Sequence, residues 1–199
     1  MKNLIYSIVM LTLFALVACE GKYPAKDIAE EESFLDDTTY VKLSSKSIVN
    51  DSLAYTYRAI LDKYMEMSDA LIEAQPIDVS KSAMEMMLLL EKANLKSLNA
   101  AQVNFWDEQM DAIALFLKKM AASKDLKVQR NEFYPLSQDL YDLYIQIGLK
   151  NFPVYKQYCP MAFKNKGAFW LSNSEEVLNP YFGSEMLHCG EIKEKIFNP

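Results

Sequence analysis

Four segments between positions 53 and 147 carry apolar residues at helical spacing. From Leu53 to Leu71, and again from Val103 to Met120, apolar residues recur every three or four positions. This alternation is typical of a helix that buries one side against its neighbours. The positions expected to be buried in the four helices are Leu53, Tyr57, Ile60, Tyr64, Met67 and Leu71, then Ala83, Met86 and Leu90, then Val103, Trp106, Met110, Ile113, Leu117 and Met120, and then Phe133, Leu136, Leu140, Leu143 and Ile147.

Short connections between these segments predict how the helices are arranged. Pro76 is expected to end the first helix, and Gly148 suits the end of the fourth. Pro135 lies inside the fourth pattern and predicts a kink there or a helix that begins nearby. Consecutive helices joined by short loops pack as antiparallel neighbours. We therefore expect an all-α fold in which residues 46–150 form an up-and-down four-helix bundle.

The helical pattern stops after Gly148, and aromatic residues and turn formers dominate the rest of the chain. This change predicts a loop-rich cap over residues 151–199 that packs on the bundle. The pattern allows a short β-hairpin that joins residues 154–159 to 168–171. Aromatic side chains such as Trp170 are expected to pack the cap onto one end of the bundle.

The composition excludes several classes of function. The 199 residues carry 21 basic and 27 acidic side chains, which argues against a nucleic-acid binder because phosphate neutralisation needs clustered Lys and Arg. The five glycines form no phosphate-binding or dinucleotide-binding loop, so no nucleotide is expected. A single histidine excludes zinc sites built from several histidines. A helical protein that binds a ligand or a partner is the simplest remaining class.

The beginning of the chain predicts export and a lipid anchor. Lys2 precedes a short apolar run from Leu4 to Ala18, which is typical of a secretory signal peptide and too short for a comfortable membrane span. The Leu-Val-Ala-Cys sequence that ends at Cys19 resembles the lipobox of bacterial lipoproteins. We expect residues 1–18 to be removed and Cys19 to be lipidated, anchoring an exported protein to a bacterial membrane, on its periplasmic or outer-membrane face. The alternative is an ordinary cleaved signal with an incidental cysteine.

Residues 19–45 are predicted to form a flexible acidic tether that follows the lipidated cysteine. Six carboxylates fall between positions 27 and 37, and Gly21 and Pro24 interrupt local order. A segment this charged buries too little apolar surface to offset its ordering entropy. A tail that gathers metal ions is the alternative, but a solvated spacer between membrane and domain fits the composition better.

Sulfur ligands gather in the predicted cap. Cys159 and Cys189, the cysteines other than Cys19, both lie there, and each has a methionine within three positions. Cysteine and methionine are soft donors that select Cu(I) or Ag(I) over hard cations. Pro160 makes a stiff turn that would aim the two sulfurs beside it at one point. The candidate metal ligands are Cys159, Met161, Met186 and Cys189, with His188 as a fifth.

The same two cysteines permit other states. Outside the cytoplasm, an even pair left after lipidation of Cys19 suits a disulfide bond between Cys159 and Cys189. Closing the loop between them would stabilise the cap by roughly 3–4 kcal/mol. A disulfide, a metal-binding thiolate pair and a pair of free buried thiols therefore all remain open.

Catalysis is not expected from this sequence. His188 stands next to Cys189, but consecutive side chains usually diverge, and no third residue is evident to orient an imidazole base. The carboxylates of the predicted tether would be too mobile to act as a general acid and base.

Three motifs resemble a family of uncharacterised helical bacterial domains. They are Tyr-Cys-Pro-Met-Ala at 158–162, Gly-Ala-Phe-Trp-Leu-Ser at 167–172, and the stretch at 179–190 that opens with Asn-Pro-Tyr-Phe-Gly. Members occur as stand-alone lipoproteins or exported proteins, and also attached to periplasmic adaptor subunits of heavy-metal (copper/silver) efflux systems. A helical segment precedes the motifs in the family, so the resemblance covers residues 45–199. The matching positions are Cys159, Pro160, Met161, Trp170, Asn179, Pro180, Tyr181, Gly183, Met186, Cys189 and Gly190, whereas His188 stands where a small polar residue is more frequent.

The resemblance implies an exported protein associated with heavy-metal efflux. We therefore hypothesise that the cap binds Cu(I) or Ag(I), and that the protein serves as a metal buffer or as a delivery partner for an efflux adaptor or pump. The alternative is an interaction module without metal, in which a Cys159–Cys189 disulfide staples a cap that docks a protein partner.

Overall fold

The computed structural model describes residues 39–42, 51–96 and 98–198. The predicted signal peptide, the predicted lipidation site Cys19 and most of the predicted tether lie outside these residues. Thr39–Lys42, which the composition places in the tether, forms strand β1. This strand pairs in parallel with strand β4 (Glu191–Phe197), so this part of the expected tether belongs to a sheet instead. The composition of this segment predicts no structure. Its main chain is ordered by hydrogen bonds to a strand that is distant in the sequence.

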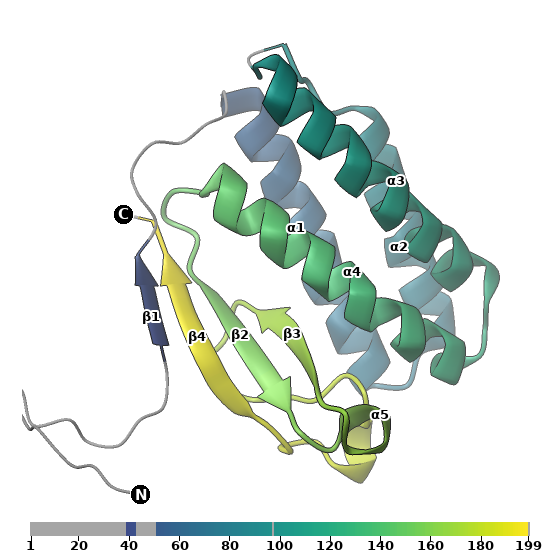
Figure 1. Ribbon diagram of the computed structural model, residues 1–199. Coiled ribbons are helices and arrows are strands. Elements are labelled where there is room, and N and C mark those ends of the chain that lie inside the picture. Colours follow the sequence, from purple (N-terminus) through teal and green to yellow (C-terminus); the bar gives the residue numbers. More distant parts are fainter. Residues whose placement is uncertain (1–38, 43–50, 97, 199) are drawn as a thin grey trace, which may run out of the picture. The chain divides into compact units, whose positions relative to one another are not determined.

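The described residues form four long helices, α1 (Asp51–Ile72), α2 (Pro76–Glu91), α3 (Ala100–Ala122) and α4 (Leu126–Ile147). Each helix packs against the next, and α1 also contacts α4 (Figure 1). The predicted core positions are buried except Leu90, Val103 and Met110, which are half-buried. The predicted helical bundle is therefore present, with its apolar faces turned inward. Within the described part of the chain, no helix combines the length and the apolarity needed to cross a membrane.

The ends of the helices follow from local chemistry. α2 begins at Pro76, where a residue without an N–H group loses no helical hydrogen bond. The Asp125 carboxylate accepts a hydrogen bond from the backbone N–H of Lys127 at 2.8 Å and so caps α4. Gly148 ends α4 in the left-handed conformation that favours glycine. Of the two expectations for Pro135, a helix that begins beside it is wrong, since α4 begins at Leu126, after the cap at Asp125, and runs through the proline.

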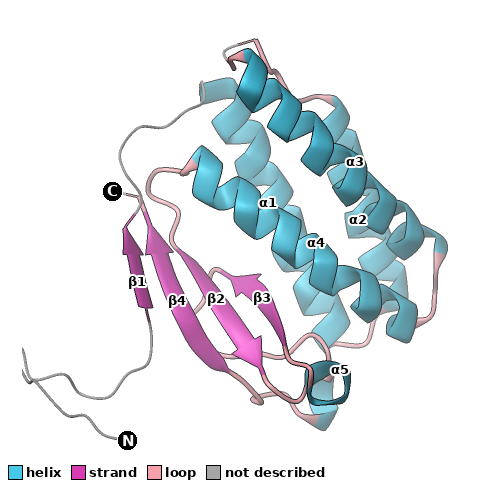
Figure 2. Ribbon diagram, in the orientation of Figure 1, coloured by secondary structure: helices cyan, strands magenta, loops and turns pink. Residues whose placement is uncertain are grey.

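The all-α expectation needs correction, because the C-terminal region contains strands. β2 (Val154–Cys159), β3 (Ala168–Ser172), β4 and β1 form one sheet in the order β1-β4-β2-β3 (Figure 2). β2 and β3 pair in antiparallel register up to Cys159↔Ala168, which confirms the predicted hairpin. The segments between the strands include two short turns of helix, α5 (Ala162–Asn165) and η1 (Gly183–Glu185). We refer to residues 151–198 as the cap.

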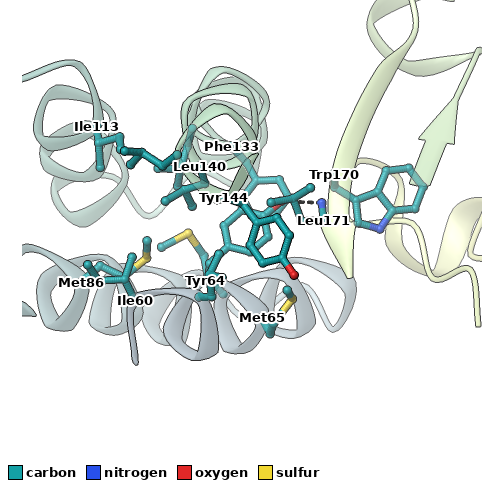
Figure 3. Close-up of a cluster of buried hydrophobic side chains, with 14 of the residues drawn as sticks. Ile60, Tyr64, Met65, Met86, Ile113, Phe133, Leu140, Tyr144, Trp170 and Leu171 are labelled. Carbon is teal, nitrogen blue, oxygen red and sulfur yellow. Dashed lines mark hydrogen bonds between the residues drawn. The ribbon is translucent and has the colours of Figure 1, made fainter. Parts of the chain in front are cut away.

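The sheet and the bundle share one core. Tyr64 of α1 stacks on Phe133 of α4 with ring centroids 4.8 Å apart. The Tyr64 hydroxyl accepts a hydrogen bond from the backbone N–H of Leu171 in β3 at 3.0 Å, drawn as the dashed line in Figure 3. A fully buried hydroxyl needs such a partner, so this bond fixes β3 against α1. The position of the cap relative to the bundle is thereby determined by buried contacts.

Candidate functional site

The strand pairing brings two cysteines together. Cys159 is the last residue of β2, and Cys189 lies two positions before β4 begins. β2 and β4 are antiparallel neighbours with Tyr158 opposite Glu191, so the two cysteines meet at the same end of the sheet. Their Sγ atoms are 3.0 Å apart, and both cysteines are free. A disulfide bond would bring the sulfurs to about 2 Å.

A buried asparagine holds the backbone around Cys189. Asn179 is fully buried, and its Nδ2 donates a hydrogen bond to the Cys189 carbonyl at 2.7 Å. Its Oδ1 accepts hydrogen bonds from the backbone N–H groups of Tyr181 at 2.9 Å and Phe182 at 3.3 Å. Sequence reasoning did not assign this positioning role to Asn179, although a buried amide that ties three backbone groups is a recurrent way to order a loop.

Gly190 allows the approach of Cys189 to β2. A Cβ atom at this position would lie 3.0 Å from the Trp170 ring and 3.0 Å from the carbonyl oxygen of Tyr158. Trp170 is buried and packs edge-on against Tyr181, with ring centroids 5.9 Å apart. Trp170 therefore packs against Tyr181 within the cap, and a side chain at residue 190 would force its ring or the Tyr158 carbonyl to shift.

A hydrogen bond between the two sulfurs raises the pKa of one of them. Cys159 is fully buried, whereas Cys189 is half-buried. The hydrogen bond with Cys159, together with burial and the charge of a Cys159 thiolate, raises the pKa of Cys189 to about 11. Cys189 is therefore a thiol at neutral pH in this arrangement. A metal ion or an oxidant must therefore displace the proton of Cys189 before it can bond to this sulfur.

The other candidate ligands lie within three positions of one of the two cysteines in the sequence. Met161 follows Cys159 by two residues and is 45% exposed. Met186 is half-buried, and its carbonyl accepts a hydrogen bond from the backbone N–H of Cys189 at 3.0 Å, so a tight turn joins the two residues. His188 is exposed, and its Nδ1 lies 3.1 Å from the carbonyl oxygen of Val177. Among the described residues, His188 makes no hydrogen bond to either sulfur.

The donor set is limited to sulfur. The described residues contain no group of three or more His, Cys, Asp or Glu side chains arranged to hold a metal ion. The structure therefore brings together Cys159 and Cys189, with the methionines in adjacent turns, and it does not draw in carboxylates. Such a pair has two chemistries available, which are coordination of a soft metal ion and oxidation to a disulfide.

A second polar cluster, which the sequence pattern did not reveal, fixes β2 against the bundle. Lys156 Nζ lies 2.7 Å from the Glu194 carboxylate and 4.0 Å from the centre of the Tyr141 ring. The Tyr141 hydroxyl donates a hydrogen bond to Glu194 at 2.7 Å. These contacts join α4, β2 and β4, and they orient the strand whose last residue is Cys159. A lysine and a glutamate in different segments give no sequence signal of this pairing.

Comparison with known proteins identifies the domain that contains the helices. No curated protein and no solved structure shows significant similarity to the chain. The matched family model begins within α1 and ends just after α4, so it covers most of the helical bundle and stops before β2 and the cysteine pair. Residues 60–151 match the model of the family described as "Protein of unknown function (DUF3347)", and this domain is therefore present in the chain.

Proposed function

We propose that the reduced Cys159–Cys189 pair binds a soft monovalent metal ion, Cu(I) or Ag(I). The observation that carries the proposal is the 3.0 Å separation of the two Sγ atoms, which come from segments far apart in the sequence. Two adjacent thiolates form a soft donor set that discriminates against Mg²⁺ and Ca²⁺. The proposed function is binding: the Nδ1 atom of His188 faces the Val177 carbonyl, and among the described residues no His, Asp or Glu side chain joins the two cysteines in one cluster.

Binding would replace the protons of both thiols by the metal ion. Cys159 and Cys189 supply the two primary donors in this proposal, and a small opening of the pair makes room for the ion. The thioethers of Met161 and Met186 are the next donors, because each is joined to a cysteine by a short turn. His188 is a further candidate, and it would have to leave the Val177 carbonyl to take part.

The biological role that we propose is a metal buffer, or a delivery partner for a heavy-metal efflux adaptor or pump. A lipid on Cys19 would hold the protein at a bacterial membrane, with the acidic segment before β1 as a spacer. Neither Cys19 nor that segment lies among the described residues. The support for this role is the sequence resemblance together with the half-buried position of Cys189 and the exposure of Met161, which follows Cys159 by two residues.

Metal binding can be tested by competition for Cu(I) with bicinchoninate, using the fully reduced chain under anaerobic conditions. We expect one equivalent of Cu(I) per chain, and loss of uptake in Cys159→Ser and in Cys189→Ser. Met161→Leu and Met186→Leu should weaken uptake by about tenfold or less. Met84→Leu is the matched control, because Met84 is 49% exposed and lies on α2, outside the cap. Absence of uptake by the reduced chain, or full uptake by both cysteine variants, would rule out the proposal.

The short sulfur separation also favours a second candidate, an interaction module without metal. Here an external oxidant removes two electrons and two protons from Cys159 and Cys189 and leaves a disulfide that staples the cap for docking of a protein partner. Thiol titration of the unfolded chain, purified without reductant, decides between the two. Two reactive cap thiols support the metal site, whereas none, combined with no Cu(I) uptake after reduction, supports the stapled module.

A further inference from the structure

A hollow of about 360 Å³ lies between the beginning of α4, the α5 turn and the segment after Pro180. Figure 1 shows α5 beside the first turns of α4. The described residues that line the hollow include none of the candidate metal ligands, so a ligand there would be independent of the cysteine pair. The side chains that define its chemistry are Lys127, Arg130, Phe163, Lys164, Tyr181 and Phe182.

Arg130 supplies a half-buried positive charge to this hollow. Its Nε donates a hydrogen bond to the Pro180 carbonyl at 2.9 Å, and its Nη2 donates one to the Leu71 carbonyl at 3.0 Å, near the end of α1. These bonds hold the guanidinium in place but do not neutralise it. Burial lowers the pKa of Arg130, with Glu185 opposing that shift from a distance. In the described ranges, Arg130 forms no ion pair, and its Nη1 makes no hydrogen bond.

Two lysines add charge at the rim of the hollow. Lys127 lies one turn before Arg130 on α4, and Lys164 belongs to the α5 turn. Both are exposed, and neither forms an ion pair within the part of the chain that the structure describes. The chain as a whole has a net charge of −6, whereas three positively charged side chains line this one hollow. A half-buried guanidinium that shares a hollow with two lysines favours an anion. A charge-assisted hydrogen bond to the anion replaces the hydration that the guanidinium loses on burial.

The floor of the hollow is aromatic. The rings of Phe163 and Tyr181 meet edge to face with centroids 5.3 Å apart, and Phe182 lies beside them. The Tyr181 hydroxyl donates a hydrogen bond to the Phe169 carbonyl at 2.6 Å, so it is already occupied. The hollow therefore offers flat apolar surfaces next to cations, and a small inorganic anion would leave these surfaces uncovered.

The turn that carries two of these side chains has an unusual backbone. Phe163, Lys164 and Asn165 all have positive φ angles, between 51° and 65°. A non-glycine residue in this region costs of order 1–3 kcal/mol, and three in succession are rare. The turn places Phe163 against Tyr181 and Lys164 at the hollow.

We infer that this hollow binds an aromatic carboxylate, with the carboxylate at Arg130 between the two lysines and the ring against Phe163 and Phe182. The carboxylate would accept hydrogen bonds from the guanidinium at Nη1, which makes no hydrogen bond among the described residues. A planar guanidinium and a planar carboxylate match each other in geometry. The ring would cover the apolar floor in the way that aromatic pairs pack within a core. The site lies beside the cap but needs neither the cysteines nor a metal ion.

The test uses equilibrium dialysis of the full chain against 2-naphthoate, which is quantified by its own fluorescence. We expect saturable binding of one equivalent, and binding weaker by about tenfold for 2-naphthamide, which has the same ring and no charge. Acetate in excess should compete poorly, because it lacks the ring. Equal binding of the acid and the amide, or no saturation by either, would overturn the inference.

Matched lysine variants locate the site. Lys164→Gln and Lys127→Gln should each weaken 2-naphthoate binding by about threefold or more. Lys166→Gln and Lys124→Gln remove the same charge from exposed neighbours that do not line the hollow, and should leave the affinity within about twofold. Equal weakening by all four variants would show a non-specific effect of net charge and would overturn the assignment of the hollow. Arg130 is left unchanged because it also bonds the end of α1.

Discussion

In the bundle, apolar side chains at helical spacing supply most of the buried contacts, whereas the cap is ordered by main-chain pairing and by a few buried polar side chains. Gln157 donates hydrogen bonds to the carbonyls of Ser174 and Glu176, and Asn198 donates one to the carbonyl of Gly148. Each of these amides is fully or almost fully buried. The bundle therefore spreads its stability over many similar contacts, while the cap depends on individual side chains, and the cap also holds the thiol pair.

Phe133→Ala should produce the largest effect, because this residue connects the two regions. Its ring stacks on Tyr64 and meets Tyr181 of the cap at 6.0 Å. We expect a loss of about 3–5 kcal/mol in the free energy of unfolding, from lost burial and the cavity left behind. Urea denaturation, followed by far-UV circular dichroism and by thiol accessibility, should show bundle and cap unfolding together.

The control for this variant is Tyr55→Ala, which removes an aromatic ring that is 77% exposed on α1. It should change stability by less than about 0.5 kcal/mol. If Phe133→Ala were equally mild, or if the cap unfolded in a separate transition, the shared core inferred for Phe133 would be wrong.

Asn179→Ala should give the next largest effect, and it should act on the cap. The variant removes the partners of the Cys189 carbonyl and of the Tyr181 and Phe182 N–H groups. We expect a loss of about 2–3 kcal/mol, because buried backbone groups are left without hydrogen bonds. Helical content should be retained, while Cu(I) uptake should fall because the sulfurs are no longer held together.

Asn173→Ala is the matched control, since Asn173 is an exposed asparagine in the same region. It should leave both the stability and the Cu(I) uptake unchanged. Unaltered Cu(I) affinity in Asn179→Ala would contradict the positioning role assigned to Asn179.

The same contrast explains which parts of the fold the sequence predicted. Apolar residues recur at helical spacing over several turns of each helix. The pattern therefore predicts that positions such as Leu53 and Leu140 are buried, as they are in the structure. β4 has no comparable signal, because charged residues fill most of Glu191–Phe197 and Ile196 is its single fully buried residue. Its pairing with β1 joins the two ends of the described chain through main-chain atoms, and no side-chain pattern encodes such a contact.

The candidate site shows a similar division. The sequence indicated that Cys159 and Cys189 belong to one region, and the structure places their sulfurs 3.0 Å apart. The roles of Asn179 and Arg130 did not emerge, because each depends on backbone carbonyls from segments that only the folded chain brings near. Soft-metal binding by this pair stays a prediction, as does the part assigned to His188.

Asp139→Asn should produce a smaller effect that depends on pH. Burial, and then the nearby Asp142 carboxylate, raises the pKa of Asp139 from 3.8 to about 6. The folded state therefore binds this proton more tightly than the unfolded state, so the stabilisation is complete below about pH 4 and is lost as the pH rises through 6. In the described structure, Oδ2 of Asp139 is buried without a hydrogen-bond partner.

Replacing this carboxylate by an amide should stabilise the bundle by about 1 kcal/mol at pH 7, a value reduced for solvent screening of a half-exposed group. At pH 3.5 the variant and the parent chain should be equally stable. Thermal denaturation at the two pH values measures the difference. A variant that is less stable at pH 7 would show that ionised Asp139 has a favourable role in the bundle.

The last prediction concerns the reactivity of one thiol in the cap and leaves the bundle unaffected. Because the pKa of Cys189 is raised to about 11, chiefly by its hydrogen bond with Cys159, little thiolate is present at pH 7.5. Alkylation of Cys189 by iodoacetamide, in the reduced chain without oxygen, should be slow and should accelerate steadily from pH 7 to pH 10. Cys159→Ala removes the hydrogen bond and should raise the rate at pH 7.5 by about tenfold. Mass spectrometry of the modified peptide measures this rate, and an unchanged rate in Cys159→Ala would mean that the two thiols do not interact in solution.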